Sequence, residues 1–424
     1  MREMKDSGIE WIGDIPVQWT INKGKYLFQQ RSTKGNNIEL QLLSPTQKFG
    51  VIPQSLFEEL TTNTAVKINE KTDLMTFKTI HVGDYCISLR SFQGGFEYSL
   101  YEGVVSPAYT VFFAKCTLCQ RYYKYLFKDQ SFIKEMNSYT LSLRDGKNIS
   151  FDDFSNTYLP IPPISEQKAI ADYLDKQCKE LNALVSDIQH QIETLEEYKR
   201  SVITEAVTKG LDKNVEMKDS GVQWIGEIPE HWITHPLYFY FGERKNKNIL
   251  GLETNLLSLS YGKIIRKDIN SNGGLLPESF NTYNIIEEND IIIRPTDLQN
   301  DKRSLRTGIS REHGIITSAY IAMKTIKPVN PEYFHYLLHA YDVMKVFYNM
   351  GNGVRQGLNF SEFSRLMVFE PPIKEQNDIV AYLKDKCDEI DLAIAEKKQQ
   401  IETIEEYKKS LIFEYVTGKK EVTQ

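Results

Sequence analysis

The amino-acid sequence predicts an α+β protein in which two similar mixed α/β domains, in a pseudo-twofold arrangement, are separated by two long repeated helices that form an antiparallel coiled coil. The first observation is a duplicated tryptophan box, since residues 4–19 read MKDSGIEWIGDIPVQW and residues 217–232 read MKDSGVQWIGEIPEHW. The second is a duplicated helical segment, because PPISEQKAIADYL and IETLEEYKRSVITEAVT return as PPIKEQNDIVAYL and IETIEEYKKSLIFEYVT. The third is that the blocks between these copies are far less alike. We therefore expect one scaffold that carries two different blocks.

The order of the copies predicts four segments. Residues 1–160 form the first domain, and residues 161–212 form the first long helix, which acts as a spacer. Residues 213–370 form the second domain, and residues 371–424 form the second long helix. A chain of 424 residues is long enough for several hydrophobic cores.

Apolar residues recur every seven positions through the first long helix. They are Leu174, Leu181, Ile188, Leu195 and Val202, with Leu184 and Tyr198 expected between them and Cys178, Val185 and Ile192 widening the stripe. The second helix keeps the pattern at Leu383, Ile390, Ile404 and Leu411, with Lys397 interrupting it. A sustained seven-residue repeat is typical of a coiled-coil seam. We expect the two helices to pack on each other; the alternative is that each packs only on its own block.

The ends of the long helices also have sequence signals. Ser165 follows a Pro-Pro pair and is expected to begin the first helix, with Glu166 and Gln167 in its first turn. Gly210 and Gly418 stand where the two helices should stop.

Each divergent block is predicted to combine short strands with a helix. Residues 85–89, 104–113, 290–293 and 314–323 are rich in β-branched and aromatic residues, which favour strands. Residues 122–139 and 333–348 are aromatic and helix-like. GVVSPAY in the first block matches GIITSAY in the second, so we expect one fold with different loops.

Charge is distributed unevenly between scaffold and blocks. The net charge of the chain is −6, yet residues 20–160 carry a net +3 and residues 233–370 a net +2. The scaffold therefore holds the acidic excess, and the mildly basic blocks are compatible with a nucleic-acid partner.

Several classes of protein are disfavoured by missing signals. No apolar run is long enough for a membrane span and no signal-peptide core is present, so we expect a cytoplasmic protein without a membrane partner. The five scattered cysteines predict neither a disulfide framework nor a metal site. Common nucleotide-binding and catalytic motifs are missing, so we expect no catalytic residues and no cofactor-binding residues in this chain.

Cations interleaved with amides and hydroxyls in expected loops are the candidate DNA contacts, because such side chains bind base edges and phosphates. In the first block they are Arg31, Lys34, Gln47, Lys48, Arg90, Gln93, Arg144 and Lys147. In the second block they are Arg244, Lys245, Lys247, Lys263, Arg266, Lys267, Arg294, Arg303, Arg306, Arg355 and Gln356. Solvated surface charge is the alternative for any one of them. Arg144 and Arg355 occupy matched positions, and they could equally be structural ties.

The duplicated boxes and helices resemble the specificity subunit of type I restriction–modification systems. The match covers essentially the whole chain through the DSGIEWIGDIPVQW and PPISEQKAIADYL motifs and their second copies. The resemblance implies two target-recognition domains, each of which reads one half of an interrupted site in double-stranded DNA. It also implies a non-catalytic subunit that docks two adenine-methyltransferase subunits and is joined by restriction subunits. S-adenosylmethionine, ATP and Mg²⁺ would then be bound only by those partners.

Two other functions remain open at this point. A protein–protein adaptor could use the same scaffold without reading DNA. A self-contained methyltransferase or nuclease would need motifs that the sequence lacks.

Overall fold

The computed structural model describes residues 2–35, 40–61, 74–88, 95–139, 149–270, 277, 279–296, 305–346, 350 and 357–422. The chain divides into two compact units, and each is described by itself. Unit 1 comprises Met1–Ile188 and Gln399–Gln424, and unit 2 comprises Gln189–Lys398. Each unit thus contains one block and a part of both long helices, whereas the four predicted segments keep helices and blocks apart.

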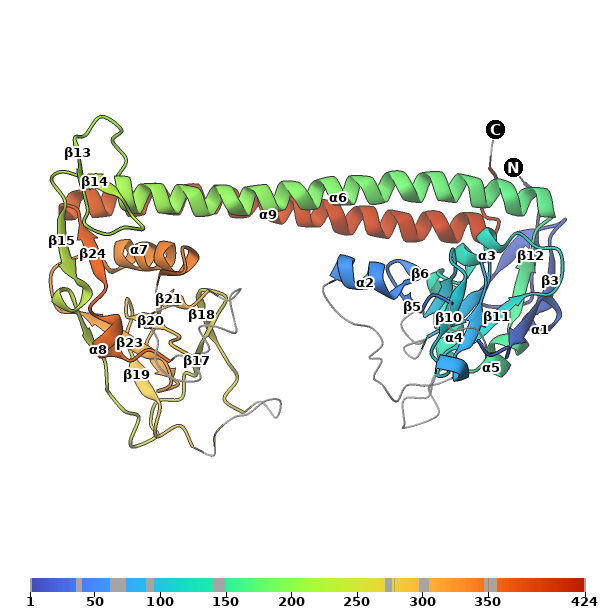
Figure 1. The fold of residues 1–424 in the computed structure, drawn as a ribbon, viewed down its shortest axis with the longest axis horizontal. Coiled ribbons are helices and arrows are strands. Elements are labelled where there is room, and N and C mark those ends of the chain that lie inside the picture. The colour runs from blue at the N-terminus through green and yellow to red at the C-terminus, as the bar shows by residue number, and fades with distance from the viewer. Residues whose placement is uncertain are drawn as a thin grey trace. The chain divides into compact units, whose positions relative to one another are not determined.

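The block of unit 1 consists of short strands and short helices (Figure 1). They are β1 (Met4–Asp6), β2 (Asp14–Pro16), β3 (Thr20–Lys23), α1 (Gly24–Leu27), β4 (Phe28–Arg31), β5 (Leu43–Thr46), β6 (Gly50–Pro53), α2 (Gln54–Thr61), η1 (Leu74–Thr76), β7 (Lys78–Ile80), β8 (Tyr85–Ile87), β9 (Phe96–Tyr98), β10 (Gly103–Val105), β11 (Thr110–Ala114), α3 (Gln120–Leu126), α4 (Gln130–Ser138), α5 (Phe151–Asn156) and β12 (Tyr158–Ile161).

The block of unit 2 follows the same order of strands. They are β13 (Met217–Asp219), β14 (Glu227–Pro229), β15 (Ile233–Pro236), η3 (Leu237–Phe239), β16 (Phe241–Glu243), β17 (Leu257–Ser260), β18 (Lys263–Arg266), β19 (Asn284–Ile286), β20 (Ile291–Ile293), β21 (Thr307–Ile309), β22 (Gly314–Ile316), β23 (Ile321–Thr325), α7 (Pro331–Val343), α8 (Phe360–Phe363) and β24 (Met367–Glu370).

The two blocks pair their strands in the same way. Each has an antiparallel four-stranded sheet, of order β4-β11-β8-β9 in unit 1 and β16-β23-β20-β21 in unit 2. The pairs β1-β2, β12-β3, β5-β6 and β10-β7 of unit 1 recur as β13-β14, β15-β24, β17-β18 and β19-β22. The prediction that the divergent blocks share one fold is confirmed.

The predicted strands at 104–113 and 314–323 are each two strands rather than one. A turn interrupts the first run, where the backbone N–H of Tyr109 donates to the carbonyl of Ser106 at 3.1 Å. Tyr320 and Thr317 form the same bond at 3.1 Å in the second run. The matched SPAY and TSAY sequences are therefore turns, which serine and proline favour.

The helices that follow the sheet differ between the units. Residues 122–139 were expected to form one helix, but α3 ends at Leu126 and a second helix, α4, begins at Gln130. The Asp129 side chain caps α4 by accepting hydrogen bonds from the backbone N–H groups of Ser131 and Phe132. In unit 2, α7 runs through 13 residues from its Asn330 cap. Helix α2 of unit 1 has no counterpart among the described elements of unit 2.

The long helices are α6 (Ile164–Lys209) and α9 (Ile373–Val416). Helix α6 begins one residue before the predicted Ser165. The glycines expected to end the helices adopt the left-handed conformation, with φ of +73° at Gly210 and +76° at Gly418. Glycine has no Cβ that would clash in this conformation, and the predicted helix ends are therefore confirmed.

The buried stripe of α6 alternates steps of three and four residues. Leu174, Cys178, Ile188 and Ile192 are buried. The prediction that Leu184 and Tyr198 lie in this seam is wrong, because their side chains are 47% and 48% exposed. Cys178 and Ile192, which were expected only to widen the stripe, are buried in the seam instead. They belong to the second of the two core positions that each heptad of a coiled coil has.

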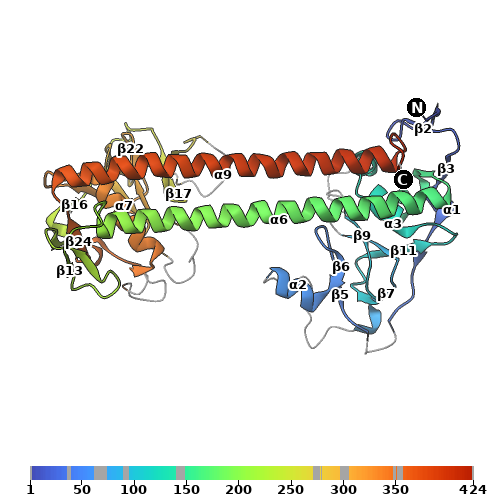
Figure 2. The same ribbon diagram turned by 90° about the horizontal axis from the view of Figure 1, so that it is seen from above.

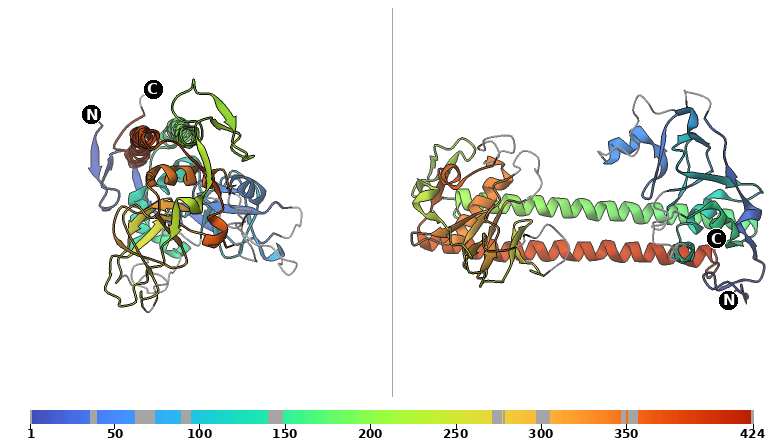
Figure 3. Two further views of the ribbon diagram at one scale, coloured as in Figure 1. Left: turned by 90° about the vertical axis from the view of Figure 1, so that its left-hand side faces the viewer. Right: turned by 90° about the horizontal axis from the view of Figure 1, so that it is seen from below.

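In both units the parts of α6 and α9 lie side by side and run in opposite directions (Figures 2 and 3). In unit 1, the rings of Tyr173 and Tyr415 are 4.5 Å apart, and Lys408 donates to Asn182 at 2.7 Å. In unit 2, Lys397 bonds to Gln191, and Lys199 pairs with Asp391 at 2.6 Å. Residue numbers fall along α9 as they rise along α6, so the predicted antiparallel pairing is confirmed.

Candidate nucleic-acid interface

The tryptophan box of unit 1 joins the block to both long helices. Trp19 is fully buried, and its indole N–H donates to Glu166 in the first turn of α6 at 2.8 Å. Gly418, just beyond the end of α9, lies so close that a Cβ there would come within 3.0 Å of the Trp19 ring. Only glycine fits this contact without a shift of the ring.

Unit 2 repeats the same joint with its own residues. Trp232 is fully buried and donates to Glu375 at 3.1 Å in the first turn of α9. Gly210, at the end of α6, would place a Cβ 3.3 Å from the Trp232 ring. Each box therefore holds the start of one long helix and the end of the other, which is a structural role.

A buried glutamine makes the second duplicated joint. The side-chain carbonyl of Gln167 accepts from the backbone N–H of Cys119 at 2.9 Å, and Gln376 accepts from that of Asn330 at 2.8 Å. Each amide group also donates, at 2.8 Å, to the carbonyl of the proline five residues before it. These bonds fix the start of α3 and of α7 against a long helix, because buried amides need such partners.

A tyrosine makes the third joint, between each block helix and the last turn of a long helix. The Tyr122 hydroxyl donates to the carbonyl of Val416 at 2.7 Å, and the Tyr333 hydroxyl donates to that of Val207 at 3.2 Å. Burial first, then nearby tyrosines and carboxylates, raises the pKa of both hydroxyls. The parts that are alike in both copies therefore assemble the scaffold.

Two of the candidate DNA contacts are structural ties at equivalent positions. Arg31 donates to both oxygens of Asp84, at 2.7 and 3.1 Å, and lies over the Phe113 ring. Arg244 pairs with Asp290 in the same way, with one bond of 3.0 Å. Both carboxylates are buried, and burial raises the pKa of Asp290. Loss of either arginine would leave a buried charge without its partner.

Arg306 is a correction to the candidate set. Its side chain is fully buried, and its guanidinium donates to the main-chain carbonyls of Thr296 and Arg294. Its backbone N–H bonds to the buried Asp342. An enclosed guanidinium that is engaged by carbonyl groups cannot reach DNA while the domain is folded.

The other described candidates lie at the surface, mostly at hairpins and strand ends. The exposed ones are Lys34, Gln47, Lys48, Lys245, Lys247, Lys263, Arg266 and Lys267, and Arg294 is half-buried. Lys48 and Lys263 occur in equivalent hairpins, at the β5–β6 turn and at the start of β18. Arg266 pairs with Glu312 at 2.5 Å, and Lys245 pairs with Glu243 at 2.8 Å. Their roles as DNA contacts stay predictions.

Seven candidates lie outside the described residues. They are Arg90, Gln93, Arg144, Lys147, Arg303, Arg355 and Gln356.

The sequence reasoning missed a histidine–glutamate contact whose two residues exchange positions between the copies. His81 Nδ1 lies 2.8 Å from Glu102 in unit 1, and His313 Nδ1 lies 2.8 Å from Glu287 in unit 2. Both pairs join the end of β7 or β19 to the start of β10 or β22. The hydrogen bond to Glu287, with help from Glu253, raises the pKa of His313. Aligning the two blocks beyond their motifs could have found this exchange, because histidine and glutamate swap places.

The described residues offer no metal centre, since no group of three or more His, Cys, Asp or Glu side chains among them could hold an ion. Within the same ranges, no helix combines the length and the apolar character that crossing a membrane demands.

Comparisons with known proteins agree with this architecture. Residues 19–194 match the family model of the type I restriction modification DNA specificity domain. The putative type I restriction enzyme MjaX specificity subunit of Methanocaldococcus jannaschii is 22% identical over 436 residues, which cover 96% of this chain and 95% of that protein. The MjaVIII specificity subunit of the same organism is 25% identical over 307 residues, 68% of each chain.

A solved structure shows the same fold. A chain from a structure concerned with complex assembly and conformational transition of the type I R-M system superimposes with a TM-score of 0.67 at 12% identity, covering 95% of this chain and 98% of that one. The doubled fold, the tryptophan joints and these matches lead to one conclusion. Residues 19–194 match the type I restriction modification DNA specificity domain, and the chain is similar over nearly its whole length to a type I specificity subunit, which together support a role in DNA recognition.

Proposed function

We propose that each block reads one half of a bipartite, interrupted DNA site. The observation that carries this proposal is the pairing of one shared strand topology with different surface residues in the two units. A repeated fold presents its loops in equivalent places, so changed loops select different bases. The exposed residues Lys48 and Lys263 lie in equivalent hairpins of the two blocks, Lys48 in the β5–β6 turn and Lys263 at the start of β18.

We further propose that the chain is a non-catalytic cytoplasmic subunit that docks two adenine-methyltransferase subunits, with restriction subunits joining the complex. S-adenosylmethionine, ATP and Mg²⁺ are then bound by those partners. The acidic outer face of the long helices supports a docking role, since Glu193, Glu196 and Glu197 are exposed on α6. Such a face repels DNA phosphates and suits a protein partner.

Duplex binding tests DNA reading directly. The chain assembled with its methyltransferase subunits should bind a specific duplex with an affinity that falls steeply between about 50 and 200 mM salt, because phosphate contacts release counterions. Salt-independent binding, or none, would favour the protein–protein adaptor without DNA readout.

Methylation mapping tests the bipartite site. Cells that carry this system should show adenine methylation on one motif with two specified halves and an unspecified spacer. Purified chain alone, incubated with duplex and S-adenosylmethionine, should transfer no methyl group. Methyl transfer by the chain alone would overturn the non-catalytic role.

A further inference from the structure

The second half of each long helix carries a surface strip that recurs almost unchanged in the other copy. Residues 191–205 of α6, in unit 2, align with residues 400–414 of α9, in unit 1. The exposed residues of α6 that recur are Gln191, Glu193, Thr194, Glu196, Glu197, Tyr198, Ser201 and Glu205, and they return as Gln400, Glu402, Thr403, Glu405, Glu406, Tyr407, Ser410 and Glu414. Arg200, which returns as Lys409, is the one exposed residue in this range of α6 that changes.

Positions inside the seam change more than this strip does. Val202 and Ala206 of α6 are buried, and they return as the buried Leu411 and Tyr415 of α9. Packing constrains buried side chains most tightly, because a change of volume creates a cavity or a clash. Identity at the exposed positions therefore has a cause other than the packing of the two helices.

Exposed positions in the first halves of the helices are not kept. They diverge in pairs that include Lys168 and Asn377, Asp172 and Ala381, Lys176 and Asp385, and Lys179 and Asp388. Two of these pairs reverse the charge. Exposed residues of this scaffold are thus free to change, which makes the constant strip an exception.

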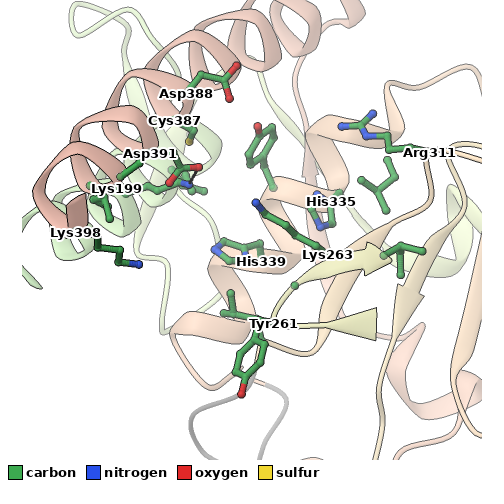
Figure 4. A pocket seen from close by; sticks show the side chains of 18 residues that line it. Lys199, Tyr261, Lys263, Arg311, His335, His339, Cys387, Asp388, Asp391 and Lys398 are labelled. Atoms are coloured by element: carbon green, nitrogen blue, oxygen red, sulfur yellow. Dashed lines mark hydrogen bonds and ion pairs between the residues drawn. The ribbon is translucent and has the colours of Figure 1, made fainter. Parts of the chain in front are cut away.

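The side of the helices that faces the unit 2 block differs between the copies as well. A cavity of about 670 Å³ lies between the β17–β18 hairpin and both helices, and Lys199 pairs with Asp391 at its wall (Figure 4). In unit 1 the corresponding Lys408 bonds to Asn182, which is a neutral partner. The repeated identity therefore belongs to the exposed strip and not to the contacts with the blocks.

A tyrosine stands within each strip. The side chains of Tyr198 and Tyr407 are 48% and 53% exposed. Exposed aromatic rings on a polar surface are typical anchors of protein–protein interfaces, because a partner gains most by burying them.

A second tyrosine lies near each of these anchors. In unit 2, pairing with Glu389 and then the nearby Tyr198 and Tyr382 raise the pKa of Lys386, so the two tyrosines lie on either side of one lysine. In unit 1, pairing with Glu414 and then Tyr407 and Tyr173 raise the pKa of Lys420 in the same way. Tyr173 and Tyr382 are themselves equivalent residues of the two helices. Each unit thus presents the same pair of tyrosines around a lysine.

The charge of the strips indicates the kind of partner. Each strip has four glutamates against two cations, Lys199 and Arg200 in α6 and Lys408 and Lys409 in α9. This acidic excess repels DNA phosphates and attracts a basic protein surface. Because the strip occurs once in each unit, its occupant is one kind of protein that binds twice.

We propose that Tyr198 in unit 2 and Tyr407 in unit 1 each anchor one methyltransferase subunit, whose contact surface is an apolar hollow with a basic rim. This inference rests on the proposed docking of two methyltransferase subunits, which is the partner proposed in two copies. It goes further by assigning one tyrosine-centred site to each unit.

Native mass spectrometry of the full chain mixed with its methyltransferase subunit counts the bound subunits. The wild-type chain should carry two. Tyr198→Asp should weaken the unit 2 site by about 30-fold or more, because the anchoring ring is replaced by a further negative charge. At a concentration just above that which saturates the wild-type chain, one subunit should then remain. Tyr407→Asp should likewise leave one subunit, and the double variant should leave none.

Lys176→Asp is the matched control. It adds negative charge to the exposed surface of α6, and the second copy already has Asp385 at this position, so two subunits should remain bound. Unchanged hydrogen exchange in α6 and α9 would show that each variant is folded.

Two subunits on the double tyrosine variant, or the loss of one in Lys176→Asp, would overturn the proposal. Loss of only the restriction subunits from the assembled complex would also overturn it, because the strip would then bind that partner. A wild-type chain that binds no methyltransferase subunit would instead refute the proposed docking function itself.

Discussion

Units 1 and 2 share one strand topology but fasten their blocks to the long helices by different chemistry. Unit 1 uses the ion pairs of Arg121 and Lys124 with Asp175 of α6, and inside its block Lys128 pairs with the buried Glu97. Unit 2 places His335 and His339 at the same positions and leaves a cavity. The tryptophan, glutamine and tyrosine joints are the same in both. The comparison indicates that the tryptophan, glutamine and tyrosine joints specify the fold, because they are kept in both units. The charged residues between block and helices differ from one unit to the other without changing that fold.

The largest expected effect concerns what the units share. Trp19→Ala and Trp232→Ala should each destabilise their own unit by about 3–5 kcal/mol, because a fully buried ring is lost. Hydrogen exchange resolved along the chain would measure each unit separately. A large loss in one unit and a small loss in the other would show that the two joints are not equivalent.

The second prediction concerns what the units do not share. At pH 8, above the raised pKa of Glu97 (about 7), Lys128→Met should cost unit 1 about 3 kcal/mol, because the ionised Glu97 is then buried without its partner. The matched variant His339→Met should cost unit 2 less than about 1.5 kcal/mol, since a neutral group is replaced by an apolar one of similar size. Urea denaturation of both variants would compare them. Equal losses of unfolding free energy in the two variants would mean that the lysine–glutamate pair of unit 1 stabilises its unit no more than the histidine of unit 2 does.

The units should also respond to pH in opposite directions. Burial outweighs Lys128 and raises the pKa of Glu97 to about 7 from 4.5, so folded unit 1 holds this proton and loses stability as pH rises from 4.5 to 7. Burial lowers the pKa of His335 to about 3 and that of His339 to about 4, from 6.5. The unfolded chain then binds these protons first, and unit 2 loses stability as pH falls below 6.5.

Between pH 6.5 and pH 5 the change is roughly 2 kcal/mol for each histidine, at about 1.4 kcal/mol per pKa unit. Hydrogen exchange at several pH values would follow each unit. Glu97→Gln should abolish the response of unit 1 and leave that of unit 2. Parallel responses in the wild-type chain would refute the assigned protonation states.

The smallest expected effect is at the surface. Lys48→Ala and Lys267→Ala remove exposed cations from unit 1 and unit 2. If each contacts a phosphate, duplex affinity should fall almost uniformly across sequences, and the salt dependence should lose about one counterion. Unchanged salt dependence in both variants would remove these lysines from the interface.

Much of the scaffold could be predicted from the sequence, because its signals are local or repeated. The heptad stripe predicted α6 and α9, and Gly210 and Gly418 predicted their ends. Leu184 and Tyr198 were misplaced because a seven-residue repeat alone does not say which face the partner helix covers.

The candidate interface was less predictable, because burial and pairing depend on distant residues. Arg306 resembles any loop arginine in the sequence, and only the fold encloses it. Arg31 pairs with Asp84, which lies 53 residues later in the sequence, and no local sequence pattern predicts this pair. The replacement of Lys124 in α3, and of Lys128 just beyond it, by His335 and His339 in α7 becomes visible only when the tyrosine joints align the two helices.

The most direct test of the account is to exchange one block and map adenine methylation. Replacing residues 20–160 by the corresponding block of another specificity subunit keeps Trp19 and the long helices from residue 161 onward. The account predicts that one half of the methylated motif changes while the other half stays the same. A change in both halves, or in neither, would contradict the claim that each unit reads its own half of the site.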